Sequence, residues 1–280
     1  MAYNFLLFYL ITIQLMKLTL IITTYNWPES LLLVFESIKN QTILPDEVII
    51  ADDGSTEETK DLITNFNNNS NINIFHSWQE DIGFRASRSR NKAIIKASGD
   101  YIILIDGDMI LHPRFIQDHL SSKELGYFIQ GSRVLLSEIH SNIAIEEKKI
   151  NFSPFSSGLT NRKNSIHSTL LSKIFTNKNK HLRGIKSCNM AFYAKDCIKI
   201  NGFNNDFEGW GREDSEFAAR LLNSGIRRKN IRFNAIQYHL WHHENTRVLL
   251  DKNNAILEQT LSSNIFWCEN GINSIKDNEN

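Results

Sequence analysis

The first part of the chain alternates two hydrophobic patterns, continuous apolar runs and segments in which apolar residues recur every three or four positions. A short continuous run is typical of a strand covered on both faces, whereas the wider spacing is typical of an amphipathic helix. This alternation predicts an α/β fold, with a mostly parallel sheet and helices on both of its faces. The predicted strands are 18–24, 47–51, 72–75 and 101–105, and the predicted helices are a segment from Pro28 through Ile38, a segment capped by Ser55 or Thr56 that runs through Phe66, and 85–97.

The second half of the chain has a less regular pattern. Residues 137–180 are polar and rich in Lys, Ser and Asn, so we predict a mobile insertion with partial helix, placed to act as a lid. The apolar residues of 231–236 predict another strand, and those of 216–222 recur at helical spacing. The basic cluster Arg227–Lys229 with Arg232 is interpreted as a solvated turn, with contact to anionic lipid or a phosphorylated acceptor as the alternative.

The N-terminus begins with an apolar run at 5–13 that is too short to span a bilayer. No Lys or Arg precedes it, so it lacks the charged start of a secretory signal. One hypothesis is that Met16 is the native start and that residues 1–15 are an upstream extension. The alternative is a short segment that touches a membrane.

Composition excludes several classes of protein. The net charge is +0 and the pI is about 7.1, which gives no reason to expect a nucleic-acid partner. The three cysteines contain no CxxC pair, so we expect neither a disulfide framework nor a zinc site. Such cysteine usage fits a reducing compartment and predicts a cytoplasmic protein, with peripheral association at the inner face of the plasma membrane as an option.

Asp106-Gly107-Asp108 directly follows the apolar run at 101–105 and is the most informative polar motif. Two carboxylates at the end of a buried strand are costly unless a cation compensates them. Their oxygen atoms suit Mg²⁺ or Mn²⁺, which commonly also hold the phosphates of a substrate. The alternative is an Asp-Gly turn that closes a hairpin.

Polar residues also follow two other predicted strands, Thr23–Asn26 after the first and Asp52–Ser55 after the second. Ligands bind beyond the carboxyl ends of strands in open parallel sheets, so three such clusters favour one binding site over three separate turns. The chain has neither GxxxxGK[ST] nor a GxGxxG after its first strand, which argues against a nucleoside triphosphatase and a nicotinamide-dependent enzyme. We therefore expect a nucleotide-bearing substrate held by a metal and side chains.

Four motifs follow one another along the chain: Thr23-Thr24-Tyr25-Asn26, Asp52-Asp53-Gly54-Ser55, Arg90-Asn91 and Asp106-Gly107-Asp108. Together, and in this order, they resemble the donor half of a family 2 glycosyltransferase with the GT-A fold. Farther on, Gly202-Phe203-Asn204 and Gly209-Trp210-Gly211-Arg212-Glu213-Asp214 resemble the WGxED segment of the galactosyltransferase-type acceptor half, which also occurs in polypeptide N-acetylgalactosaminyltransferases and bacterial chondroitin-type polymerases.

The resemblance covers residues 17–250 and implies a division of the chain. The expected fold is a Rossmann-like, mostly parallel sheet flanked by helices, with a smaller acceptor-side subdomain. The expected parts are an N-terminal extension at 1–16, a nucleotide-sugar donor half at 17–125, an acceptor-binding and catalytic half at 126–250 with the insertion near 137–180, and a C-terminal helix and tail at 251–280, where the tail after Asn270 is expected to fray.

On the donor side, the resemblance also implies individual roles. Asp53 resembles the acid that recognises uracil, and Thr23 and Tyr25 resemble the pocket for the base. Arg90 stands where the family has an arginine beside the nucleotide, and Asp106 resembles the aspartate on the ribose side.

On the acceptor side, Asp214 resembles the general base, and Glu213 beside it is expected to contact the acceptor or the donor sugar. Trp210, followed by Gly211, is expected to stack on a sugar face. The family motif often reads WGGED, but Arg212 replaces the second glycine. Arg212 must therefore avoid positive φ or accept strain, and it adds a cation near the sugars.

Asp108 resembles the metal ligand of the family, and a histidine near the C-terminus is expected to complete the metal site. His239 matches best because it follows a predicted strand and an aromatic residue, and His242 is the second choice. The expected cofactor is Mn²⁺ or Mg²⁺.

The expected function is a metal-dependent, inverting hexosyl transfer from a UDP-sugar to a hydroxyl of a saccharide or lipid-linked saccharide, in the synthesis of lipopolysaccharide, capsule or another surface glycan. Two alternatives come from other classes: a nucleotidyltransferase acting on sugar phosphates, and a non-catalytic glycan-binding protein of the same fold.

Overall fold

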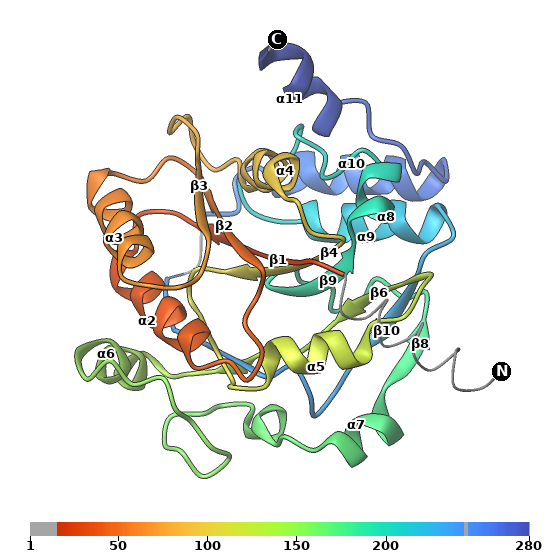
Figure 1. Cartoon of the computed structure of the whole chain (residues 1–280). Coiled ribbons are helices and arrows are strands. Elements are labelled where there is room, and N and C mark those ends of the chain that lie inside the picture. Colours follow the sequence, from red (N-terminus) through yellow and green to blue (C-terminus); the bar gives the residue numbers. More distant parts are fainter. Residues whose placement is uncertain (1–15, 244–245, 280) are drawn as a thin grey trace, which may run out of the picture.

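The computed structural model of the chain describes residues 16–243 and 246–279. It consists of one large sheet with helices packed on both faces (Figure 1) and a second, smaller sheet. The predictions made for residues 1–15 lie outside the described residues. Within the described ranges, no helix has the length and apolar character needed to cross a membrane.

The large sheet has the strand order β3-β2-β1-β4-β9-β6-β10-β8. The first four strands in this order are parallel, and β9 then pairs antiparallel with both β4 and β6. The strands are β1 Leu18–Thr24, β2 Glu47–Asp52, β3 Ile74–Trp78, β4 Tyr101–Asp106, β6 Tyr127–Gln130, β8 Asn177–Asn179, β9 Asn189–Tyr193 and β10 Arg227–Asn230. The sheet thus continues across the predicted boundary between the donor and acceptor halves.

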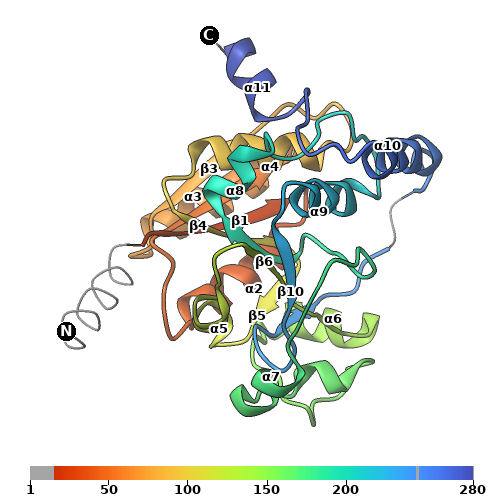
Figure 2. The same cartoon turned by 90° about the vertical axis from the view of Figure 1, so that its right-hand side faces the viewer.

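Alternate residues of the central strands fill two cores, because successive side chains of a strand point to opposite faces. Leu20 and Ile22 of β1 face the core beneath α2, α3 and α5, whereas Ile21 faces the core beneath α4, α8, α9 and α11. Figure 2 shows the two helical layers above and below the sheet. The helices are α2 Pro28–Lys39, α3 Glu57–Asn68, α4 Ala86–Lys96, α5 Phe115–Ser122, α8 Ala194–Lys199, α9 Glu213–Asn223 and α11 Ile272–Glu279. This architecture confirms the predicted α/β class.

A second, three-stranded sheet brings distant parts of the chain together. In it, β11 (Gln237–His239) pairs antiparallel with β5 (Met109–Leu111) and parallel with β7 (Val134–Leu135). The register places His239 opposite Met109, the residue that follows the Asp106-Gly107-Asp108 motif. No hydrophobic pattern in the sequence indicated this sheet, because its strands are only two or three residues long.

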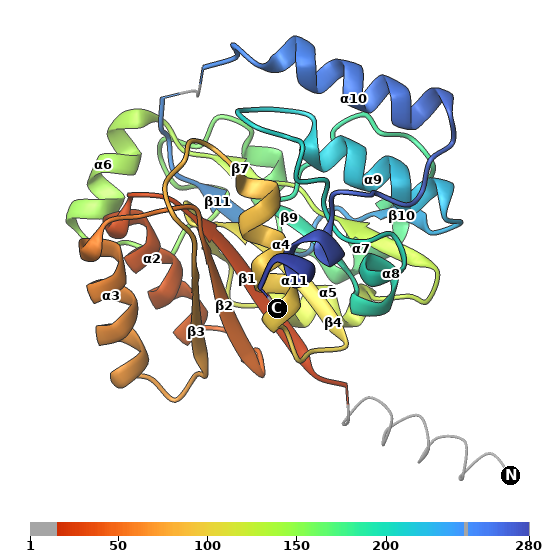
Figure 3. The ribbon, with the colours of Figure 1, turned by 90° about the horizontal axis from the view of Figure 1, so that it is seen from above.

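The predicted insertion at 137–180 contains partial helix, as expected. It includes α6 (Glu138–Glu146), the 3₁₀ helix η1 (Arg162–Ser165) and α7 (Thr169–Phe175), followed by strand β8. On the opposite side, α10 (Leu250–Ser262) lies alongside α9 (Figure 3). The role of the insertion as a lid stays a prediction.

Two predictions for the second half are wrong. Arg227–Asn230 form strand β10 instead of a solvated turn, and Arg228 is buried. Residues 231–236 do not form a strand, because Phe233 (φ 62°) and Ala235 (φ 49°) have backbone angles that extended chain does not allow. The apolar residues at 231 and 236 are nevertheless buried, which explains why the sequence resembles a strand.

Two smaller predictions also need correction. The third strand is Ile74–Trp78 instead of 72–75, because its pairing with β2 continues to the level of Asp52 and includes the polar His76 and Ser77. The C-terminal tail does not fray after Asn270. It forms α11, whose Ile275 is fully buried.

Candidate active site

A cleft of about 1650 Å³ opens beyond the carboxyl ends of β1, β2 and β4. Its walls come from both predicted halves of the chain and from α10. Every site residue predicted from the sequence lines it: Thr23, Tyr25, Asp53, Arg90, Asp106, Asp108, Trp210, Gly211, Arg212, Glu213, Asp214, His239 and His242. In particular, the cleft joins Asp108 with Asp214, which are far apart in the sequence.

Asp53 is fixed at the end of β2 by two neighbours. Its Oδ1 accepts a hydrogen bond from Gln79 Nε2 (2.6 Å) and its Oδ2 accepts one from the Arg85 backbone N–H (2.7 Å). Burial raises the pKa of Asp53, and the bonds from Arg85 and Gln79 oppose that rise. Each oxygen keeps a second lone pair, so Asp53 can also accept a bond from a ligand in the cleft.

Tyr25 stands at the mouth of the cleft with its ring half exposed. Its hydroxyl donates to Asp81 Oδ2 at 2.9 Å. A rigid, half-exposed aromatic ring at a binding site is suited to stacking on a planar base. Asp81 is a cleft residue that the sequence analysis missed, because it follows β3, whose end was predicted three residues too early.

Arg90 connects the two sides of the cleft. Its Nε donates to Thr23 Oγ1 (3.1 Å), its Nη2 lies 3.5 Å from Asp106 and its Nη1 lies 3.4 Å from Glu213. The side chain is only 5% exposed, so water screens these charges weakly. A single buried cation therefore holds the end of β1, the end of β4 and the start of α9 in one arrangement.

Asp108, His239 and His242 form a cluster whose possible metal-binding atoms lie within 4.8 Å of one another. Nε2 of each histidine lies 3.2 Å from Asp108 Oδ2, while Asp108 Oδ1 is buried and has no hydrogen-bond partner among the described atoms. Burial raises the pKa of Asp108, but the bonds to His239 and His242 outweigh that effect and hold the pKa well below its ordinary value. An ionised carboxylate with an unpaired oxygen beside two imidazoles fits a divalent cation.

The second ring nitrogen of His242 is also positioned. Nδ1 lies 2.7 Å from the backbone carbonyl of His243, a contact in which Nδ1 carries the proton. Nε2 faces Asp108: it donates to the carboxylate when the ring is protonated, and it offers a lone pair to a cation when the ring is neutral. Metal-binding histidines are commonly oriented in this way by a bond from their other nitrogen.

The Asp-Gly turn at 106–107 does not close a hairpin. The Gly107 N–H donates to the carbonyl of Thr23 (2.7 Å), and the chain then continues into β5, which pairs with β11 of the second sheet. A Cβ on Gly107 would approach Thr24 Oγ1 to 2.9 Å, so the turn packs tightly against β1. The hairpin alternative is therefore wrong, and the turn directs both carboxylates into the cleft.

The Gly-Trp-Gly-Arg segment before α9 has an unusual backbone. Gly209 and Gly211 have positive φ (67° and 105°), and Arg212 at the start of the helix also has a φ of 78°. Of the two outcomes expected for Arg212, the structure shows the strained one. The Arg212 side chain donates through Nε to Asn254 of α10 (2.7 Å), so it also ties α9 to α10.

Asp214 lies in the first turn of α9 and faces the cleft. Burial raises the pKa of its carboxyl to about 7, and the neighbouring charge of Glu213 adds to the rise, whereas Arg90 opposes it. A carboxyl with such a pKa is partly ionised near neutral pH, as a general base requires. The helix dipole favours the anion in this turn, but burial has the larger effect here.

Further cleft residues were not predicted from the sequence. Trp241 and Arg247 follow β11, and the Arg247 guanidinium lies 5.0 Å from the centre of the Trp210 ring. Arg133 and Lys186 add cations from loops that have no recognisable pattern. The other wall consists of Leu250, Leu257 and Leu261 of α10, whose spacing on one helix face was the only available signal.

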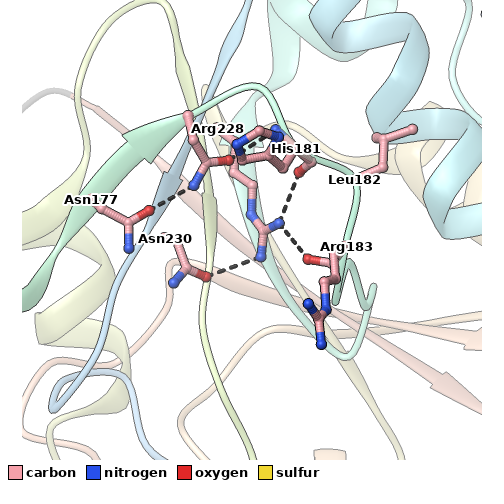
Figure 4. Close-up of a pocket in the computed structure, with 7 residues that line it drawn as sticks. Asn177, His181, Leu182, Arg183, Arg228 and Asn230 are labelled. Atoms are coloured by element: carbon pink, nitrogen blue, oxygen red, sulfur yellow. Dashed lines mark hydrogen bonds between the residues drawn. The ribbon is translucent and has the colours of Figure 1, made fainter.

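A second pocket, of about 560 Å³, lies next to the cleft, and Figure 4 shows the residues that line it. Leu182 and Arg183 line both spaces. Arg228 of β10 donates through Nη1 to the carbonyls of His181 (2.9 Å) and Arg183 (2.8 Å) and through Nη2 to Asn230 Oδ1 (3.0 Å). Arg228 thus fixes the loop at 181–183, which contributes to the lining of both pockets.

Comparison with known proteins identifies the family of the chain. Residues 19–170 match the family described as "Glycosyl transferase family 2", and residues 171–244 match the "N-terminal domain of galactosyltransferase". The chain is 26% identical to the chondroitin synthase of Escherichia coli over 244 residues, which cover 79% of this chain and 34% of that protein. It is 30% identical to the hyaluronan synthase of Pasteurella multocida over 231 residues, 76% of this chain and 23% of that protein.

Among solved structures, TarS of S. aureus (residues 1–349) in complex with UDP is similar with a TM-score of 0.61 and 16% identity, over 91% of this chain and 67% of that chain. This likeness shows a shared fold, that of the GT-A glycosyltransferases. The chain spans only about a third or less of the length of the two synthases. The family match to residues 19–170 covers more than half of the 280 residues, and the chain therefore belongs to glycosyl transferase family 2.

Proposed function

We propose that this chain transfers a hexose from a UDP-sugar to a saccharide hydroxyl, with inversion at the anomeric carbon and with a divalent metal. The observation that carries the proposal is that the Asp108 cluster and the Asp214 carboxyl open into one cleft, where Arg90 contacts Asp106 and Glu213 beside them. An inverting transfer needs charge compensation for the leaving diphosphate on one side of the sugar and a proton acceptor on the other.

The donor half, 17–125, holds the nucleotide in this proposal. The second lone pairs of Asp53 accept the uracil N–H, and the half-exposed ring of Tyr25 stacks on the base. Asp106 bonds the ribose, and Arg90 contributes positive charge beside the diphosphate. The UDP bound to TarS, a protein of the same fold, supports a uridine nucleotide.

Asp108, His239 and His242 would hold Mn²⁺ or Mg²⁺ in this proposal. When bound, such a cation supplies positive charge for the phosphate oxygens of the donor. The oxygen and two imidazole nitrogens of the cluster suit Mn²⁺ better than Mg²⁺, which prefers oxygen alone.

The acceptor half, 126–250, positions the hydroxyl that attacks. The Asp214 carboxylate takes its proton, and Trp210 stacks on the face of a sugar ring. The names of the two synthases that the chain resembles support a saccharide acceptor, and we propose a growing surface glycan, free or lipid-linked, built on the cytoplasmic side of the membrane.

Thermal-shift measurements against a panel of UDP-sugars with Mn²⁺, followed by assays for UDP release with saccharide acceptors, test the proposal. The true donor should raise Tm by mass action, and EDTA should remove the shift. His239→Ala and His242→Ala should each lower the apparent affinity for Mn²⁺ by about tenfold or more. His243→Ala is the matched control, since its side chain lies outside the cleft and its backbone carbonyl remains.

Two outcomes would contradict the proposal. Pyrophosphate release from a nucleoside triphosphate and a sugar phosphate would indicate a nucleotidyltransferase. Binding of glycans without any response to nucleotides would indicate a glycan-binding protein. Retention of full Mn²⁺ affinity in both histidine variants would reject the metal assignment alone.

A further inference from the structure

Positive charge is concentrated in one part of this neutral chain. Its 31 basic and 31 acidic residues cancel overall, yet no Asp or Glu stands between Glu147 and Asp196, where ten Lys or Arg residues occur. Some of this charge is neutralised, as Lys178 pairs with Glu124. Arg162, Lys163 and Lys173 are exposed, and none of them has an ion pair with a described residue.

The same segment exposes large apolar side chains. Leu170 and Ile174 are 68% and 64% exposed, and they share one face of α7 with Lys173 because they lie three or four positions apart. Next to them, the Phe175 ring packs 5.5 Å from that of Phe233 and is half exposed. We call this the α7 surface; it comprises Arg162, Lys163, Ile166, Leu170, Lys173, Ile174, Phe175 and Arg232.

The α7 surface lies at an outer edge of the molecule. The stretch that contains η1 and α7 runs along the lower edge in both Figure 1 and Figure 2, away from α3 and α4. It is also close to the cleft, because Thr160 lines the cleft and Arg162 begins η1 two residues later. A partner on this surface would therefore lie beside the entrance to the candidate active site.

We propose that the α7 surface docks the protein onto an anionic phospholipid bilayer. A bilayer interface accepts exposed Leu, Ile and Phe side chains among its acyl chains while its phosphates attract Lys and Arg. A soluble polyanion would pair with the cations but leave Leu170 and Ile174 in water. The docked position brings a membrane-bound acceptor near the cleft, although the docking itself does not depend on the proposed reaction.

This surface differs from the basic cluster at 227–229 that the sequence suggested for lipid contact. Arg228 is buried and bonded to backbone carbonyls, and Lys229 pairs with Glu124. Arg232 is the only member of that cluster that belongs to the α7 surface.

Sedimentation of the full chain with vesicles tests the proposal. Binding to phosphatidylcholine mixed with phosphatidylglycerol should exceed binding to phosphatidylcholine alone and should weaken with salt. Lys163→Gln with Lys173→Gln should weaken binding about fivefold for each charge removed. Leu170→Gln with Ile174→Gln should weaken it by about tenfold or more.

Matched controls make the same chemical changes elsewhere. Lys60→Gln with Lys96→Gln, on α3 and α4, and Ile198→Gln, on α8 and 59% exposed, should bind vesicles like the unchanged chain. Unchanged Tm values show that the variants remain folded. Equal binding by both α7-surface variants and the controls would overturn the proposal. Binding to dextran sulfate that survives Leu170→Gln with Ile174→Gln, without any preference for anionic vesicles, would also overturn it in favour of a polyanionic partner.

Discussion

At the scale of single residues, Arg212 occupies a backbone conformation that disfavours every residue except glycine. A left-handed conformation costs a non-glycine residue about 1–2 kcal/mol, and the φ of Arg212 is 78°. The bond from its side chain to Asn254 of α10 offsets part of that cost. The sequence alone showed that a non-glycine residue at position 212 must either avoid positive φ or accept strain. Only the structure shows that it accepts the strain.

Replacement of Arg212 separates these two effects. Arg212→Ala and Arg212→Gly both lose the bond to Asn254, but only glycine relieves the backbone. After the entropy cost of glycine, Arg212→Gly should be about 1 kcal/mol more stable than Arg212→Ala. Urea denaturation measures the difference. Equal stability, or an alanine variant that is the more stable, would show that position 212 carries no strain.

A second residue-scale prediction concerns pH. Burial raises the pKa of Asp214 to about 7, and a base works only when ionised, so kcat/KM should rise with pH through about 7. Asp214→Asn should lower the rate by about 10²-fold or more and remove this dependence. Its Tm at pH 8 should not fall, because the variant removes an anion that burial disfavours. A pH profile that keeps its acid limb in Asp214→Asn would assign the titration to another group.

At the scale of elements, the largest difference between expectation and structure is at 227–239. The basic residues 227–229 suggested a turn and the apolar residues 231–236 a strand, but the strands are β10 and β11 on either side of a bend. Arg228 is tolerated inside because backbone carbonyls accept its hydrogen bonds, which a pattern of polar and apolar residues does not record. Positive φ at Phe233 and Ala235 is equally invisible in such a pattern.

Arg228 gives the prediction for this element. Arg228→Ala leaves the carbonyls of His181 and Arg183 without their donor, and the free energy of unfolding should fall by about 2–3 kcal/mol. Its neighbour Arg227 is exposed, so Arg227→Ala should change that free energy by no more than about 0.5 kcal/mol. Urea denaturation of the two variants provides the test. Equal effects would mean that Arg228 does not hold the loop at 181–183.

At the scale of the whole molecule, the sequence predicts the parallel half of the sheet and the edge at which ligands gather. That success depends on long, repeated signals: the apolar runs at 18–24 and 101–105 and the helices between them. The motifs likewise predicted residues that the fold brings into one cleft. The second sheet, the α10 wall and the loop cations were missed because they depend on contacts between short segments far apart in the chain.

Arg90 yields a prediction at this scale, since it touches groups from both halves. Its charge opposes the rise in the pKa of Asp214, so Arg90→Gln should move the acid limb of the pH profile above pH 7. Arg88→Gln, which removes the same charge from the same helix outside the cleft, should leave the limb in place. The two pH profiles of kcat/KM supply the comparison. An unmoved limb in Arg90→Gln would show that the charge of Arg90 does not affect the pKa of Asp214.

The antiparallel pairing of β9 with both β4 and β6 has a further consequence for the proposed reaction. Among the described residues, strand pairing is continuous from β1 through β4 and β9 to β6, so no flexible linker joins the two predicted halves. For the proposed reaction, we therefore expect the spacing between the Asp108 cluster and Asp214 to stay nearly fixed. We therefore expect any closure over the substrates to come from movement of the connecting loops. If the proposed reaction holds, preference for a new acceptor can evolve through those loops alone, without a change in the spacing between the Asp108 cluster and Asp214.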